Sequence, residues 1–265
     1  MLLMMVALLV IGAFPGFMAG LLGVGGGMML TPFMTFLFTM AGFPDELVIK
    51  MALATSLTTI LFTSVTSLRA HHQSGKVRWD IAKPMGLGAF WGTFLGANFA
   101  SALKSEWLAI FFAVFVGYSA IKMFRTSKPK PSREVPGSAS LAAVGSGVGF
   151  ISSLLGAGGG FLSTPFMVWC NVSMHQAIGT SAALGFPIAA GGLIGYVIAG
   201  LSLDSLPAWS VGYIYLPALA ACAFASLITA PIGAKTSHRM NVGFLKRVFA
   251  VLLLTLALYM ASRAI

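Results

Sequence analysis

Apolar runs of helix length alternate with short polar segments along this whole chain. Such a pattern predicts helices that lie in apolar surroundings. Two runs, of about 14 and 12 residues, are too short to cross about 30 Å of hydrocarbon at about 1.5 Å per residue. The runs fall at 1–22, 28–41, 47–68, 84–103, 107–124, 139–155, 161–172, 176–199, 211–234 and 244–262.

The composition agrees with a membrane protein. Hydrophobic residues make up 58% of the 265 residues and charged residues 8%, and the mean hydropathy is +0.93. Soluble domains carry about a quarter charged residues. The net charge of +10 does not indicate a nucleic-acid partner, because the cations lie in short loops between the apolar runs. The lipid bilayer is the expected partner, and Cys170 and Cys222, both inside apolar runs, are expected to be free.

The charges sort to two sides of the predicted membrane. Asp45, Glu46 and Asp204 lie in connections other than those that hold most of the cations. By the positive-inside rule the cation-rich loops are cytoplasmic, which places the N-terminus outside and the linker at 125–137 inside. The cations of these three loops are Arg69, Lys76, Arg78 and Lys83, then Lys122, Arg125, Lys128, Lys130 and Arg133, then Lys235, Arg239, Lys246 and Arg247.

A segment of nineteen residues occurs twice. Gly16–Met34 reads GFMAGLLGVGGGMMLTPFM and Gly149–Met167, 133 positions later, reads GFISSLLGAGGGFLSTPFM, with twelve identities. Two further matches follow, at offsets of 125 and 137 positions. Because the offset falls from 133 to 125, the first half carries eight more residues than the second between the glycine segment and the Thr-Ser pair. The two matches pair Thr55-Ser56 with Thr180-Ser181, and Gly96-Ala97 with Gly233-Ala234. The chain is therefore predicted to be a duplication.

The duplication predicts an all-α polytopic fold made of two inverted-topology repeats. Each repeat is expected to hold a broken or re-entrant glycine-rich hairpin followed by three spanning helices. An odd number of crossings inverts the second repeat relative to the first, and five complete spans in each half would do the same. The expected division is a first inverted repeat at 1–125, a cytoplasmic linker at 126–138 and a second inverted repeat at 139–265.

The glycine clusters predict breaks in the helices, because each glycine costs a helix about 1 kcal/mol relative to alanine. After each cluster, Thr31-Pro32 and Thr164-Pro165 are predicted to begin a new helix, with the threonine as N-cap and the proline in the first turn. Two such helix N-termini would offer backbone N–H groups to an anion. The alternative is that the glycines serve close helix packing.

Hydroxyl side chains are the second candidate lining. The two Thr-Ser pairs recur in both halves and could donate to an oxyanion, although such hydroxyls often bond back to their own helix. The predicted substrate-binding residues are Gly25, Gly26, Gly27, Thr31, Pro32, Thr55 and Ser56, and Gly158, Gly159, Gly160, Thr164, Pro165, Thr180 and Ser181.

Catalytic chemistry finds no support in the sequence. No Asp, Glu, Lys or Arg lies deep in a spanning run, and no His/Cys cluster has the spacing of metal ligands. A carrier of metal cations needs such ligands, and an enzyme needs a nucleophile with a base, a carboxylate pair or a metal. We therefore expect no catalytic residue, no metal and no cofactor, and we do not expect an enzyme.

The two GxGGG…TP segments, each followed by a Thr-Ser pair, resemble the TauE/SafE family of sulfite and organosulfonate exporters, within the sulfonate uptake permease superfamily. The stretch from Gly200-Leu201 through Pro207–Tyr213 is similar too. The resemblance covers essentially the whole chain. It implies transport of small sulfur-containing anions, with the family's glycine motif falling on Gly23, Gly25–Gly27, Gly156 and Gly158–Gly160.

The function expected from these observations is secondary transport in the bacterial inner (plasma) membrane. The protein would export small sulfur-containing anions such as sulfite or organosulfonates, held at the midplane between the two glycine-rich breaks, by alternating access. A passive anion channel and a non-transporting membrane subunit that binds a partner are the alternatives. The sequence leaves homo-oligomerisation, the substrate and the coupling ion open.

Overall fold

The computed structural model describes residues 2–22, 27–124, 133–203, 205–237 and 242–263. Within these ranges the chain forms ten helices and one short hairpin of strands. The helices are α1 Leu2–Leu22, α2 Gly27–Met40, α3 Asp45–Gln73, α4 Trp79–Ala102, α5 Ser105–Phe124, α6 Ser138–Leu155, α7 Gly160–Trp169, α8 Met174–Gly200, α9 Leu216–Ser237 and α10 Val242–Ser262. The strands are β1 Ser210–Val211 and β2 Ile214–Tyr215.

The fold is that of an all-α polytopic membrane protein, as predicted. Among the described residues, α3, α5, α6, α8 and α9 are long and apolar enough to cross a membrane. The two helices after the glycine clusters are shorter, 14 residues in α2 and 10 in α7. Helix α4 has 24 residues but carries Asp80, Lys83 and four glycines, which make it less apolar. The predicted division at 1–125, 126–138 and 139–265 stays a prediction.

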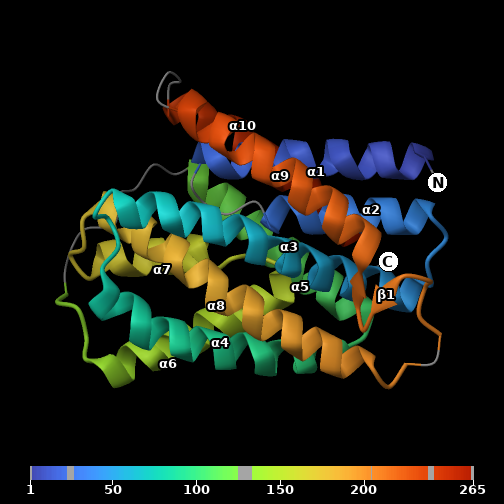
Figure 1. Ribbon diagram of the computed structural model, residues 1–265, viewed down its shortest axis with the longest axis horizontal. Helices are drawn as coiled ribbons and strands as arrows, with labels where there is room; N and C mark the ends of the chain where they lie inside the picture. Colours follow the sequence, from blue (N-terminus) through green and yellow to red (C-terminus); the bar gives the residue numbers. More distant parts are fainter. Residues whose placement is uncertain (1, 23–26, 125–132, 204, 238–241, 264–265) are drawn as a thin grey trace.

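The helices run along one common direction between two ends of the molecule (Figure 1). The N-terminus, the turn between α2 and α3 and the β1–β2 hairpin lie at the right-hand end. Helix α3 ends at the left, where α4, α6 and α8 begin. Thus α1 and α6, which open the two halves, start from opposite ends. An ion pair of 2.9 Å between Arg263 and Asp45 joins the end of α10 to the start of α3.

The two halves exchange helices in packing. Helix α4 lies along α6 of the other half and α9 lies along α1, while α3 and α8 pack together in the centre. Side chains from Met51 to Ile60 of α3 are all buried. The glycine-rich face of α4 is therefore covered by a helix of the second half, and that of α1 likewise.

Glycines set the closest approaches in these cross-half pairs. A Cβ at Gly145 of α6 would overlap the carbonyl oxygen of Met85 on α4. A Cβ at Gly12 of α1 would lie 2.5 Å from the Cα of Cys222 on α9. Gly12 and Gly145 are 133 positions apart, and Met85 and Cys222 are 137 apart. The sequence duplication is thus repeated in the packing contacts.

The eight additional residues of the first half have a simple structural account. Helix α2 has four residues more than α7, 14 against 10. Thr55 lies ten positions after the start of α3 at Asp45, whereas Thr180 lies six after the start of α8 at Met174, which gives four more. The insertion therefore extends each helix of the α2–α3 hairpin by about one turn.

The predicted helix starts at the Thr-Pro pairs are wrong. Helix α2 begins at Gly27 and α7 at Gly160, so Pro32 and Pro165 lie inside helices. Each proline is the sixth residue of its helix, just past the first turn, and it removes one backbone hydrogen bond because it has no N–H. In both copies the helix begins at the last glycine of the cluster, five residues before the proline.

Candidate functional site

The two glycine breaks meet in the interior of the protein. A Cβ at Gly27 would overlap the carbonyl oxygen of Gly156 and lie 3.0 Å from the Cα of Ala157. The buried Thr31 hydroxyl, near Gly27, donates to the carbonyl of Leu155 at 3.2 Å and to that of Gly27 at 3.3 Å. Segments far apart in the chain are thus in direct contact, as a shared site requires. The predicted residues Gly25 and Gly26 lie outside the described ranges.

The end of α6 at the second break is capped by its own backbone. Gly156 has a φ of +61°, which glycine adopts readily. Its N–H donates to the carbonyl of Ser153, and the N–H of Ala157 donates to that of Ser152 at 3.1 Å. These two bonds form the Schellman arrangement, which satisfies carbonyls at a helix end.

Among the described residues, backbone N–H groups at the start of α7 lack acceptors. Gly159 has a φ of +72°, and its carbonyl accepts from the N–H groups of Leu162 and Ser163 at 3.0 and 2.9 Å. Within the described residues, the preceding N–H groups at the break have no recorded acceptor; they are those of Gly158, Gly159, Gly160 and Phe161. Unpaired N–H groups at the positive end of a helix are suited to an anion.

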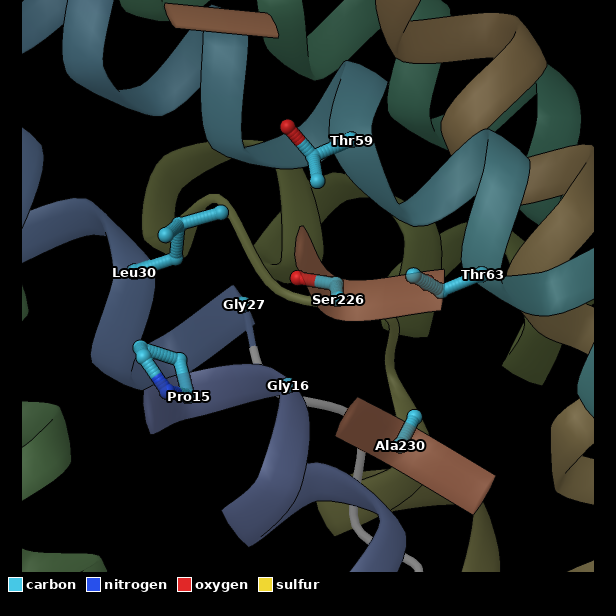
Figure 2. Close-up of a pocket in the computed structure, with 8 residues that line it drawn as sticks. All are labelled: Pro15, Gly16, Gly27, Leu30, Thr59, Thr63, Ser226 and Ala230. Atoms are coloured by element: carbon cyan, nitrogen blue, oxygen red, sulfur yellow. The ribbon is translucent and has the colours of Figure 1, made fainter. Parts of the chain in front are cut away.

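A small cavity lies beside the first break (Figure 2). Its volume is about 30 Å³. Since a water needs about 10–15 Å³ measured in this way, it has room for about two. Its three hydroxyls already donate, Thr59 to Thr55, Thr63 to Ile60 and Ser226 to Gly12. The lining is Pro15, Gly16, Gly27, Leu30, Thr59, Thr63, Ser226 and Ala230.

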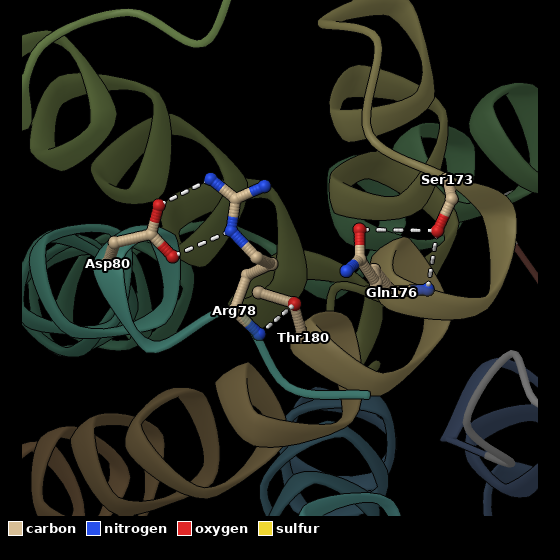
Figure 3. Close-up of polar contacts among 5 residues, drawn as sticks. All are labelled: Arg78, Asp80, Ser173, Gln176 and Thr180. Carbon is tan, nitrogen blue, oxygen red and sulfur yellow. Dashed lines mark hydrogen bonds and ion pairs between the residues drawn. The ribbon is translucent and has the colours of Figure 1, made fainter. Parts of the chain in front are cut away.

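The predicted threonines join the two halves. Thr180 of α8 accepts a hydrogen bond of 3.0 Å from the N–H of Arg78, just before α4 (Figure 3). Thr55 of α3 accepts one of 3.1 Å from the N–H of Tyr215, just before α9. The threonines are 125 positions apart and their donors 137 apart, which are the offsets of the sequence matches. Both hydroxyls are buried and accept these bonds, and each keeps its own proton, which is what the predicted donor role requires.

Polar contacts at the start of α4 hold one of these donors in place. The Arg78 guanidinium binds Asp80 with bonds of 2.8 and 2.5 Å, and these bonds raise the pKa of Arg78 (Figure 3). Nearby, Ser173 caps α8 by accepting from the N–H of Gln176 at 3.4 Å. Arg78 is therefore charged at this end of the bundle, where the sequence places a cytoplasmic loop.

The predicted serines bond to different partners in the two halves. Ser56 donates to the sulfur of Met34 at 3.5 Å, whereas Ser181 lies 2.7 Å from the hydroxyl of Ser163. Ser163 was not predicted, since it replaces the apolar Leu30 of the first repeat. That difference between the copies is the signal that could have identified it.

The remaining predicted residues differ in contacts and burial. A Cβ at Gly158 would be 3.3 Å from Ile60. Pro32 is buried in α2, while Thr164 and Pro165 are half-buried in α7. In the part of the chain that the structure describes, no three His, Cys, Asp or Glu side chains come together as a metal site. The chemistry available here is that of neutral hydroxyls, N–H groups and carbonyls.

Membrane-spanning helices whose glycine-rich breaks meet inside the bundle define the class as a polytopic membrane transporter. The chain belongs to the sulfite exporter TauE/SafE family, whose sequence profile matches residues 8–260. The relatives of similar length are named as transporters, which points to transport rather than catalysis.

Three relatives illustrate the likeness. A probable membrane transporter protein of Haemophilus influenzae is 33% identical over 95% of this chain and 96% of its own length. One of Methanocaldococcus jannaschii is 26% identical over 98% of this chain and 96% of its own. One of Bacillus subtilis is 29% identical over 70% and 76%. No solved structure matches the chain significantly.

Proposed function

We propose that this protein is a secondary transporter that exports small sulfur-containing anions such as sulfite or organosulfonates. The observation that carries the proposal is the contact of the two glycine breaks, Gly27 against Gly156 and Ala157, in the interior of the bundle. Broken helices that meet at the midplane are the usual way for a secondary transporter to build a site. The name of the family supplies the substrate class.

The proposed anion lies between the two breaks and is bound by neutral donors. Backbone N–H groups at the start of α7 have no acceptor among the described residues. Such donors bind an anion without a buried countercharge, which would be costly in the membrane. The resulting affinity is modest, and a carrier needs modest affinity to release its substrate.

Alternating access is proposed to come from the two halves rocking as inverted repeats. The opposite starting ends of α1 and α6 in Figure 1 support this arrangement. So do the two cross-half bonds, from Arg78 to Thr180 at the left-hand end and from Tyr215 to Thr55 toward the hairpin end. One bond would open while the other holds, so that the site faces one side at a time.

The proposed setting is the bacterial inner membrane, with the linker at 125–137 in the cytoplasm and the N-terminus outside. Export of an anion then follows the membrane potential, negative inside. Each negative charge gains about 2.3 kcal/mol per 100 mV.

Efflux from proteoliposomes tests this proposal. Purified protein is reconstituted into vesicles loaded with sulfite, and efflux is followed with and without an imposed potential. Sulfoacetate, taurine, thiosulfate, sulfate and chloride serve as competitors. We expect saturable efflux that is accelerated by an inside-negative potential and inhibited by sulfonates more than by chloride.

Two results would contradict it. Efflux equal to that of protein-free vesicles for every anion would remove the transport function. Efflux that rises linearly with concentration, without saturation, would favour the channel. The matched control is Gly147→Ala, at an exposed glycine where a Cβ meets nothing within 4 Å, and it should transport like the wild type.

A further inference from the structure

The two breaks differ in polarity although their glycines are the same. In the second repeat Ser152 stands where the first repeat has Ala19, 133 positions earlier. Likewise Ser163 stands where the first has Leu30. The duplicated scaffold therefore carries additional hydroxyls at its second break only.

One of these hydroxyls has no partner. Ser152 is 0% exposed, and its Oγ makes no hydrogen bond within the described part of the chain. A Cβ built on Gly159 would lie 3.1 Å from this Oγ, so the hydroxyl faces the start of α7. Buried hydroxyls are rarely left unpaired, because the loss of water is not compensated.

Its neighbours cannot take its place. The Ser153 hydroxyl donates to the carbonyl of Phe150 at 2.7 Å. Ser163 and Ser181 pair with each other at 2.7 Å, and Ser163 also reaches the carbonyl of Gly159 at 3.1 Å. The protons of these hydroxyls are therefore already used within the protein.

The hydroxyls near the first break are also engaged. Thr31 donates to carbonyls of both halves, and Ser226 donates to Gly12 at 2.9 Å. What remains toward the small cavity is oxygen lone pairs, which repel an anion. The described hydroxyls near the first break are thus all engaged, whereas the Ser152 hydroxyl at the second break has no partner among the described residues and lies beside backbone N–H groups.

We propose that the second break holds the anionic group of the substrate, with the Ser152 hydroxyl and the N–H groups at the start of α7 as its donors. This rests on the proposed function and adds a residue and a position to it: Ser152, beside the second break. The ligand is an oxyanion, as the proposed function implies, and each of its oxygen atoms can accept from a different donor.

Sulfite titration of the purified full-length protein tests the role of Ser152. Binding is measured calorimetrically for the wild type, Ser152→Ala, Ser152→Cys and the matched control Ser153→Ala, and melting temperatures are measured without anion. We expect Ser152→Ala to weaken sulfite binding about tenfold or more, because the bond to a charged partner is lost. Its melting temperature without anion should equal or exceed that of the wild type, because an unpaired buried group is removed.

The controls separate binding from folding. Ser153→Ala should bind sulfite like the wild type, and Ser152→Cys, a similar shape with a weaker donor, should lie between wild type and Ser152→Ala. Unchanged affinity in Ser152→Ala, equal weakening in Ser153→Ala, or a lowered melting temperature of Ser152→Ala without anion would each overturn this inference alone. A wild type that binds none of sulfite, sulfoacetate and benzenesulfonate would overturn the proposed function itself.

Discussion

The two cross-half helix pairs, α4–α6 and α9–α1, occupy equivalent places in the duplication but are held together differently. In α4–α6 both helices supply glycines, and a Cβ at Gly92 would overlap the carbonyl oxygen of Ser146. In α9–α1 the glycines come from α1, and Ser226 of α9 donates a hydrogen bond of 2.9 Å to Gly12. The α4–α6 contact depends on the close approach of the two backbones. The α9–α1 contact also depends on a side-chain hydrogen bond.

The sequence explains the difference. Gly88 and Gly92 of α4 correspond, at an offset of 137, to Ala225 and Thr229 of α9. Without side chains on either helix the backbones come into contact, as small-residue faces do in membranes. Where α9 carries larger residues, the glycines come from α1. A Cβ on these glycines would still lie 2.5–2.6 Å from Cα atoms of α9, and a hydrogen bond contributes as well. A duplicated interface can thus keep its geometry while its chemistry diverges.

The largest expected loss of stability is that of Gly92→Ala, which tests the backbone contact between α4 and α6. Gly92→Ala places a methyl group against the backbone of Ser146, which cannot move aside as a side chain can. We expect destabilisation at the upper end of the 1–3 kcal/mol typical of overpacking, about 3 kcal/mol. Thermal unfolding in detergent measures it.

The matched control is Gly147→Ala, on the exposed side of α6, where alanine improves helix propensity and meets no neighbour. It should unfold at or above the wild-type temperature. A Gly92→Ala variant as stable as this control would show that the α4–α6 backbones are not in contact.

A smaller effect is expected at the threonines that bridge the halves. Thr180→Val removes the acceptor for the Arg78 N–H, and Thr55→Val removes that for the Tyr215 N–H. Each variant should lose about 1 kcal/mol of stability, because a backbone donor is left unpaired.

Thermal unfolding of both valine variants and of the corresponding serines, which keep the hydroxyl, provides the measurement. The serine variants should retain most of the stability. Unequal losses in the two valine variants would mean that the two bonds differ in strength, although Thr55 and Thr180 occupy equivalent sequence positions.

The smallest expected effect is that of Ser226→Ala in α9. It removes the bond to Gly12, and hydrogen bonds between membrane helices contribute about 0.6 kcal/mol on average. The decrease in unfolding temperature should be well below that of Gly92→Ala. A larger decrease would indicate that the α9–α1 contact depends mainly on this hydroxyl.

The duplication and the second helix break could be read from the sequence, because the glycine cluster recurs with its spacing and each glycine costs a helix about 1 kcal/mol relative to alanine. Helix α6 ends at Leu155 and α7 begins at Gly160, as the second cluster indicates. The helix start at Thr31 was wrong, because the N-cap preference of threonine is weaker than tertiary context. Thr31 instead reaches the carbonyl of Leu155, a contact 124 residues away that no local pattern contains.

The direction of the hydrogen bonds at the candidate site could not be predicted either. Thr55 and Thr180 recur as hydroxyls in both halves, but whether a hydroxyl donates or accepts depends on the neighbour that folding brings to it. Ser152 is visible in the sequence only as a difference between the two copies, because Ala19 stands at the equivalent position. Identity between repeats identifies the scaffold, and difference identifies where the copies have specialised.

The packing of α4 on α6 also bears on how the protein is made. Helix α4 leaves the ribosome before its partner exists, with Asp80 and Lys83 near its start and a row of glycines along one face. Helix α4 therefore lacks its main packing partner until α6 has been synthesised. The same holds for α1, which waits for α9. Each half thus acts as the assembly template for the other, and a chain cut in the linker would form a working protein only when both pieces are inserted in one membrane.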